Sequence, residues 1–239
     1  MVPFSVQDAH DSPSVVYFRG DSLQTAKRDS MWKSQIGIAH SHGIKVFFKP
    51  HLWLHKLSPG KWRSDVFPKN DKNWELWKKT YRQYILLNAK IAEDNNVEMF
   101  CIGAELSRLT LENPEFWISL IKEAKSIYSA PITYAANWHD EYEKITFWDQ
   151  LDFIGTQAYF PLTRENKPSI LQISQGWNKY IPDFRSVSSK FNKKILFTEM
   201  GYKSTSNSAS EPWAWVEDDS ADIGLMSYET QSNCFKAFF

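Results

Sequence analysis

The sequence of 239 residues lacks several features that mark particular protein classes. It has only two cysteines, Cys101 and Cys234, too few for a disulfide framework. Lysine and arginine together number 28, as do aspartate and glutamate, so the formal net charge is zero. This balance gives no electrostatic case for binding nucleic acid or an anionic membrane surface. No apolar run comes near the roughly 18 residues that a membrane-spanning helix needs.

Glycine is also scarce, with nine residues, and none forms a Gly-x-Gly-x-x-Gly turn or a glycine-rich phosphate loop. A nucleotide-binding Rossmann domain is therefore disfavoured. The opening stretch, MVPFSVQDAH, lacks the basic region and long apolar segment of a secretory signal peptide. The sequence predicts neither a cellular location nor an oligomeric state.

What the chain does have is aromatic side chains: 11 Trp, 10 Tyr and 16 Phe, together 15% of its residues. Tryptophan at this density is typical of surfaces that stack on sugar rings, but it also fits a large domain with a bulky core. Composition alone leaves both interpretations open. Cys101 lies inside an apolar run, which favours a small core residue over a reactive nucleophile.

Apolar runs typical of strands alternate with segments of helical periodicity. The predicted strands cover residues 2–7, 43–50, 97–104, 131–137, 151–160 and 193–200. The predicted helices cover 71–95, 113–128, 168–190 and about 222–238. Asn70 or Asp71 is expected to cap the first helix and Asn113-Pro114 to open the second, while Pro182 should kink or split the third.

Alternating helices and continuously apolar strands predict an α/β fold with a parallel sheet covered by helices. A (β/α)8 TIM-type barrel fits best, because polar and aromatic residues gather after strand ends, where such barrels build their sites. Only six strands can be counted where a closed barrel needs eight. We therefore expect residues 1–239 to form one barrel-like domain without its first and last units; a reduced barrel is the alternative.

Two glutamates, Glu105 and Glu199, each end an apolar run and point to chemistry at a glycosidic bond. Glycoside hydrolysis needs one carboxylic acid to protonate the leaving oxygen and a carboxylate to attack or stabilise the sugar C1. Two carboxyl groups at the ends of separate parallel strands supply such a pair. The simpler interpretation is that each glutamate caps a helix or pairs with a basic neighbour, as Glu105 could with Arg108.

Five segments, IKVFFKPHLW, MFCIGAEL, ITYAANW, LDFIGTQAYFPL and ILFTEMGY, resemble in this order glycoside hydrolase family 113. The resemblance covers about residues 2–202 and implies a TIM-barrel enzyme of β-mannanase type. It implies Glu105 as general acid/base, Glu199 as nucleophile, and a retaining mechanism on β-1,4-linked mannose polymers. It also makes residues 2–7 the second barrel strand, so strands one and eight would be absent, in agreement with the strand count.

The chain departs from the wider clan of this family at one position. An asparagine commonly precedes the acid/base glutamate there and contacts the sugar 2-hydroxyl, but this chain has Ala104. An alanine side chain cannot make that contact. Either another residue supplies it or the substrate preference differs.

Several residues beside the two glutamates are predicted to bind substrate. His51 and Asn137 are expected to hydrogen-bond sugar hydroxyls, Trp53 and Trp138 to stack on sugar rings, and Tyr159 to hydrogen-bond Glu199. Packing or loop roles are the simpler alternatives for each. The predicted set is Lys49, His51, Trp53, Asn137, Trp138, Gln157, Tyr159 and Trp215, the last with Trp213 in a long polar loop that could rim the cleft.

A metal site is the competing hypothesis for the histidines. His40 and His42, with His51 and His55, have spacing like that of metal ligands. However, His40 and His42 fall at the end of a helix before a strand, on the opposite barrel face from His51. The sequence therefore predicts a glycoside hydrolase without metal or cofactor, acting on a β-linked oligosaccharide or polysaccharide; the alternative is a non-catalytic carbohydrate-binding protein on a degenerate barrel.

Overall fold

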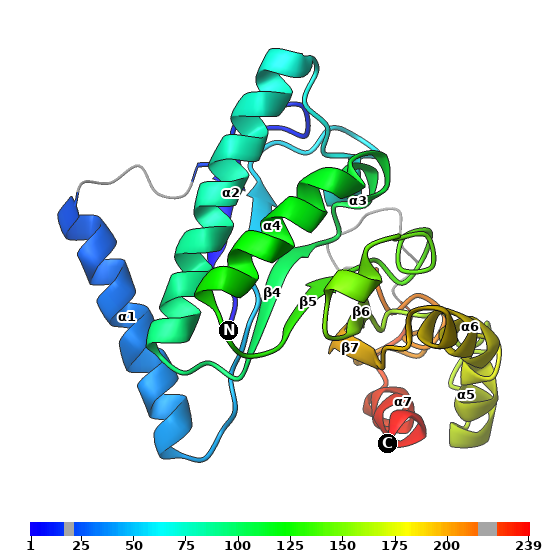
Figure 1. The fold of residues 1–239 in the computed structure, drawn as a ribbon. Helices are drawn as coiled ribbons and strands as arrows, with labels where there is room; N and C mark the ends of the chain where they lie inside the picture. The colour runs from blue at the N-terminus through cyan, green and yellow to red at the C-terminus, as the bar shows by residue number, and fades with distance from the viewer. Residues whose placement is uncertain (17–21, 215–223) are drawn as a thin grey trace. The chain divides into compact units, whose positions relative to one another are not determined.

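The structure is a computed structural model that describes residues 1–16, 22–214 and 224–239. It divides into two compact units, Met1–Gly155 and Thr156–Phe239. The first contains β1 (Phe4–Gln7), α1 (Ser22–Ser41), β2 (Phe47–Phe48), β3 (His51–Leu54), η1 (Arg63–Asp65), α2 (Asp71–Asp94), β4 (Met99–Ala104), α3 (Ser107–Glu112), α4 (Pro114–Ile127), β5 (Ile132–Ala135) and η2 (Trp148–Gln150). After β6 (Ile154–Gln157), which crosses the division, the second contains α5 (Ile170–Trp177), α6 (Ile181–Phe191), β7 (Ile195–Glu199) and α7 (Tyr228–Phe238) (Figure 1).

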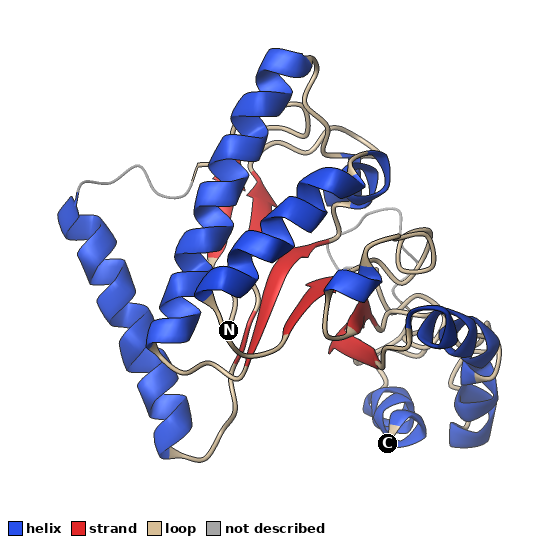
Figure 2. Cartoon of the chain, in the orientation of Figure 1, coloured by secondary structure: helices blue, strands red, loops and turns tan. Residues whose placement is uncertain are grey.

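The strands of the first unit are parallel. β1 pairs with β3, and β2 pairs with β4, which pairs in turn with β5 (Figure 2). Pro50, which has no N–H to donate, separates β2 from β3, and the amide of His51 then donates to the carbonyl of Pro3 at 2.9 Å. The predicted strand 43–50 is therefore only partly right: it is shorter at both ends, and a second strand follows the proline.

Helices α2 and α4 pack against each other beside β4 and β5 (Figure 1). Their contact is aromatic: the rings of Trp77 and Phe116 lie 6.0 Å apart, and Trp117 lies 5.2 Å from Tyr134 on β5. Trp77, Trp117 and Trp148 are fully buried. Part of the high tryptophan content therefore serves the core, as the simpler interpretation of the composition held.

Gly103 in β4 is required by this packing. A Cβ atom at Gly103 would lie 2.5 Å from the Tyr81 hydroxyl and 3.1 Å from atoms of Trp117 and Tyr134. The Tyr81 hydroxyl is itself held in place, since it donates to the carbonyl of Ile102 at 2.9 Å. The glycine therefore lets the α2 and α4 aromatic rings approach the strand that carries the candidate acid/base.

The predicted helix signals were largely confirmed. Asn70 caps α2, its side chain accepting from the amide of Asn73 at 3.0 Å. Pro114 lies in the first turn of α4, and the predicted helix 168–190 is split before Pro182 into α5 and α6. The short helix α3, which begins two residues after Glu105, was not predicted.

In the second unit, β6 and β7 pair, and Thr198 Oγ1 donates to the carbonyl of Thr156 at 3.2 Å. All five residues of β7 are only half-buried, whereas five of the six residues of β4 are buried. The last helix begins at Tyr228, later than predicted, where the hydroxyl of Ser227 accepts from the amide of Thr230 at 3.2 Å.

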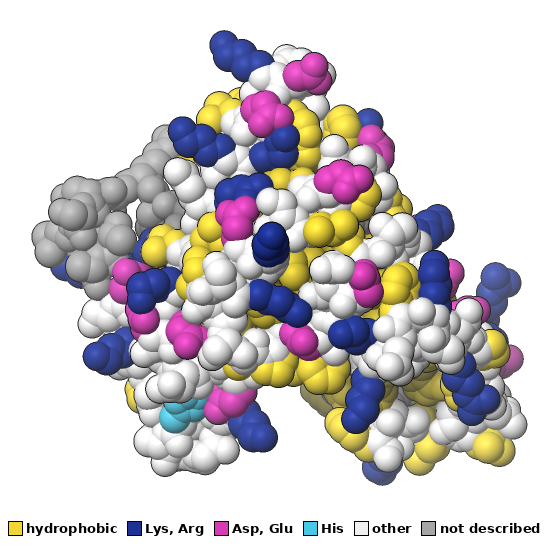
Figure 3. All heavy atoms as spheres, viewed as in Figure 1, with side chains coloured by type: hydrophobic (Ala, Val, Ile, Leu, Met, Phe, Trp, Pro, Cys, Tyr) yellow, Lys and Arg dark blue, Asp and Glu magenta, His cyan; other side chains and the backbone are white. Residues whose placement is uncertain are grey.

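Acidic and basic side chains are interspersed over α2 and α4 on the face in view (Figure 3). Arg82 on α2 pairs with Glu123 on α4, and Lys90 pairs with Asp94 at 2.6 Å. This mixed pattern matches the zero net charge of the sequence. Among the helices of the described ranges, none has the length and apolar character needed to cross a membrane.

Candidate active site

Glu105 occupies an unusual backbone position directly after β4. Its φ of 55° lies in the left-handed region, which costs a residue with a side chain about 1–2 kcal/mol. The turn is held by a hydrogen bond from the Glu105 amide to the carbonyl of Ala135 in β5, at 2.9 Å. Strained backbone of this kind persists where the surroundings determine it, and it occurs often at functional sites. The residue is also nearly buried, with 8% of its surface exposed.

Two donors converge on one oxygen of the Glu105 carboxylate. Trp62 Nε1 donates to Oε2 at 3.1 Å and Arg63 Nη2 donates to the same oxygen at 2.9 Å. Among the described residues, no hydrogen bond to the other carboxylate oxygen, Oε1, is found. When Glu105 is protonated, the two donors on Oε2 therefore favour Oε1 as the oxygen that carries the proton.

The loop that supplies these donors was not predicted. Arg108, the partner considered for Glu105 in the simpler interpretation, pairs with Glu112 at 2.9 Å, and the ion pair of Glu105 is with Arg63. The loop is ordered by Asp65, whose carboxylate accepts from the amide of Trp62 at 2.9 Å. A tryptophan and an arginine in the polar segment SPGKWRSD were the only signal of this role.

His51 joins the same network. Its Nδ1 lies 3.0 Å from Arg63 Nη1, and because a guanidinium can only donate, Nδ1 must accept and the ring proton must be on Nε2. Burial lowers the pKa of the His51 imidazole to about 2, and the charges of Lys49 and Arg63 act in the same direction. His51 is therefore neutral at any ordinary pH. Lys49, whose charge contributes to the lowered pKa of His51, is itself only 3% exposed.

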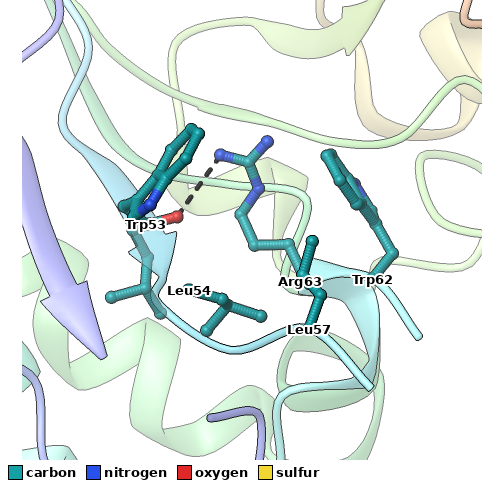
Figure 4. Close-up of a pocket in the computed structure, with 6 residues that line it drawn as sticks. Trp53, Leu54, Leu57, Trp62 and Arg63 are labelled. Carbon is teal, nitrogen blue, oxygen red and sulfur yellow. Dashed lines mark hydrogen bonds between the residues drawn. The ribbon is translucent and has the colours of Figure 1, made fainter. Parts of the chain in front are cut away.

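An apolar pocket that opens to solvent lies beside this network. Figure 4 shows the side chain of Arg63 between the indoles of Trp53 and Trp62, with its hydrogen bond to the carbonyl of Leu52. Trp53 is 58% exposed and Trp62 is 41% exposed, so both rings present apolar surface to solvent. The pocket is lined by Leu52, Trp53, Leu54, Leu57, Trp62 and Arg63.

Asn137 and Trp138 follow β5, as predicted. Asn137 is 5% exposed, and its side-chain amide donates to Ser107 Oγ at 3.4 Å. Trp138 is half-buried and packs edge-on against His139, with ring centres 4.7 Å apart. The backbone amide of Asn137 donates to Glu141 Oε2 at 2.7 Å, which brings a residue that was not predicted into the site.

Glu141 is a fully buried carboxyl group. Burial raises its pKa to about 7, while hydrogen bonds from Asn137, Tyr134, Thr110 and Ser107 act in the opposite direction. In the sequence it stands among the charged residues of HDEYEK, where nothing distinguishes it from its exposed neighbour Glu143. Only the fold reveals that it lies inside the protein.

In the second unit, Glu199 ends β7, and the expected hydrogen bond from Tyr159 is present. The Tyr159 hydroxyl donates to Glu199 Oε2 at 3.2 Å, and the Glu199 carbonyl accepts from the amide of Ala158 at 2.7 Å. Gln157, at the end of β6, is buried with 1% exposure. Trp213 is 42% exposed, and the predicted Trp215 lies outside the described residues.

The histidines proposed as an alternative metal site have other partners. His40 Nε2 lies 3.3 Å from Glu98 Oε2, and His42 Nδ1 lies 2.9 Å from the carbonyl of Ile38. Within the described ranges, no group of three or more histidine, cysteine, aspartate or glutamate side chains could hold a metal ion.

Comparisons with known proteins bear on this site. The model of Glycoside Hydrolase Family 113 matches residues 1–239. The chain is similar to the GH113 β-mannanase AaManA from Alicyclobacillus acidocaldarius, solved in complex with ManMIm: 25% identity and a TM-score of 0.79, over 98% of this chain and 68% of that one. It is similar to a second GH113 β-1,4-mannanase at 26% identity and a TM-score of 0.80, over 100% of this chain and 70% of the other.

A more distant similarity concerns the fold alone. A β-glucuronidase from Ruminococcus gnavus matches at 14% identity and a TM-score of 0.54, over 99% of this chain and 39% of that one. A search of the curated proteins found no match. These matches and the parallel strands confirm the predicted fold class, a partial (β/α) barrel, and the family resemblance stated from the sequence.

Proposed function

Because the chain belongs to glycoside hydrolase family 113, we propose that it cleaves β-1,4-linked mannose polymers with retention at C1, using Glu105 and Glu199. The observation that carries the proposal is the environment of Glu105: a strained turn at a strand end, with Trp62 and Arg63 bound to one carboxyl oxygen. A carboxyl group that merely capped α3 would need neither donor. The similar chains solved as mannanases supply the substrate class.

In the first step, the Glu105 carboxylic acid gives its proton to the glycosidic oxygen while the Glu199 carboxylate attacks C1. The bond between C1 and the leaving oxygen breaks, and an ester between C1 and Glu199 forms. Arg63, at 2.9 Å from Glu105 Oε2, is positioned to stabilise the carboxylate left by the proton transfer. The Tyr159 hydroxyl donates to Glu199 at 3.2 Å and so holds this carboxyl group in one orientation for attack.

In the second step, the Glu105 carboxylate removes a proton from water as the water oxygen attacks C1. The ester to Glu199 breaks, Glu199 leaves as a carboxylate, and Glu105 is again an acid. Two inversions at C1 give net retention. His51 and Asn137 are proposed to bind sugar hydroxyls together with Lys49 and Gln157, and Trp53, Trp138 and Trp215 to stack on sugar rings.

The test compares wild type, Glu105→Gln and Glu199→Ala on soluble mannan and on β-1,4-mannooligosaccharides. Removing either carboxyl should reduce kcat by about 100-fold or more. Glu112→Gln is the matched control, since Glu112 is an exposed glutamate on α3 and pairs only at the surface with Arg108. Proton NMR of the first product should show the β anomer before mutarotation.

Equal activity in the wild type and both variants would refute the catalytic assignment. Oligosaccharide binding measured by calorimetry, without hydrolysis by the wild type, would instead identify a carbohydrate-binding protein. Initial formation of the α anomer would refute retention while leaving the substrate class in place.

A further inference from the structure

A second carboxyl group, Glu141, lies behind the turn that carries Glu105. Its side chain is completely buried, and it belongs to the loop after β5, six residues beyond the strand. Burial of a carboxyl group is costly unless donors compensate it. The contacts of Glu141 therefore indicate what the buried group stabilises.

Donors from different elements meet on Glu141. Tyr134 Oη on β5 and Thr110 Oγ1 on α3 donate to Oε1, at 2.7 and 2.9 Å, and the amide of Asn137 donates to Oε2 at 2.7 Å. The carboxylate thus joins α3, the helix that follows Glu105, to β5 and to the loop after it. The loop after β5 contains Asn137 and Trp138, which are proposed above to bind substrate.

The Tyr134 hydroxyl links Glu141 to the turn that carries Glu105. A phenol has one hydrogen, and because it is donated to Glu141, the oxygen accepts from the amide of Leu106, at 2.6 Å. Leu106 directly follows Glu105, so this bond sets the orientation of the peptide group after the strained residue. The amide of Glu105 itself is held by Ala135.

We propose that Glu141 is a positioning residue for Glu105, acting through the Tyr134 hydroxyl on the Leu106 amide to keep the left-handed turn in place. The proposal rests on the proposed function, because it assigns Glu141 a part in presenting the acid/base. Glu141 contacts no reacting atom. Its removal lets the turn relax and moves the Glu105 carboxyl away from the glycosidic oxygen, and small displacements of a catalytic group are costly.

The test compares two substrates, of which only one needs a proton on its leaving group. A mannooligosaccharide requires protonation of its leaving oxygen, whereas a 2,4-dinitrophenyl β-mannoside has a leaving group that departs without it. In Glu141→Gln and in Tyr134→Phe, kcat on the oligosaccharide should fall about 10-fold or more with KM little changed. Dinitrophenol release in the first turnover, which precedes the base-catalysed second step, should slow by less than about 3-fold. Glu143→Gln, at the exposed glutamate two residues away, should change neither.

A second measurement does not depend on activity. Hydrogen exchange of the Leu106 amide should be faster in both variants than in Glu143→Gln, because its acceptor is lost or loosened. This readout also serves if one of the two variants fails to fold, since the other carries the same prediction.

Equal loss on both substrates, or no loss, overturns the inference, as does unchanged exchange at Leu106. Glu105→Ala separates the two proposals. If Glu105→Ala shows the selective loss and the other two variants do not, only the role of Glu141 is refuted. If Glu105→Ala shows no selective loss, the acid/base assignment fails, and the positioning role fails with it.

Discussion

The buried carboxyl of Glu141 should make the stability of the protein fall as pH rises. Its pKa is raised from 4.5 to about 7 in the folded protein, chiefly by burial. Between these two values the folded chain binds more protons than the unfolded chain, so the free energy of unfolding decreases with rising pH. The stability contributed by the neutral acid is fully present below pH 4.5 and is lost as pH passes about 7.

The size of this effect follows from the same two values. Each pKa unit corresponds to about 1.4 kcal/mol, so the contribution of Glu141 should change by about 3 kcal/mol over the window. Glu141→Gln has nearly the same shape and no titrating proton. The unfolding free energy of the variant minus that of wild type should therefore rise by about 3 kcal/mol from pH 4.5 to pH 8.

Urea unfolding followed by tryptophan fluorescence at half-unit pH intervals measures this difference. Glu143→Gln is the control, because it removes an exposed carboxyl from the same loop and should give a flat difference. A difference for Glu141→Gln that is also flat within about 0.5 kcal/mol, or that falls with pH, would refute the burial of a titrating carboxyl at this position.

Two further predictions concern the first unit. Gly103→Ala should lower the free energy of unfolding by about 1–3 kcal/mol, because the added methyl group meets the fixed Tyr81 hydroxyl. Gly37→Ala in α1, where an added Cβ meets nothing within 4 Å, should be neutral or stabilising by up to about 1 kcal/mol in the same urea assay. Equal changes in the free energy of unfolding for the two variants would contradict the close packing at Gly103. The His51 imidazole NMR signals should not shift between pH 5 and 8, since its pKa is lowered to about 2 by burial, and a transition near pH 6.5 would show that the ring is exposed.

The alternation of helices and strands along the chain could be predicted from local sequence patterns. Asn70 caps a helix because its side chain can accept from an amide three residues on, and Pro182 lies in the first turn of α6 because the N–H it lacks would have no partner there; neither depends on distant residues. Continuous apolar runs between such helices indicate parallel strands, and Glu105 stands out as a charge at the end of one. The fold class and the glutamate at the strand end were therefore accessible from the sequence.

The partners of that glutamate were not accessible, because they depend on long-range contacts. Trp62 and Arg63 reach Glu105 over about 40 positions of the chain, and Glu141 acts on its turn from the loop of the next strand. An exposed and a buried glutamate look alike in a sequence, as Glu143 and Glu141 do. The sequence by itself determined most of the helices and strands and where the carboxyl groups stand along them. Only the tertiary structure decided which side chains meet at Glu105, since burial and hydrogen bonding are properties of the packed chain.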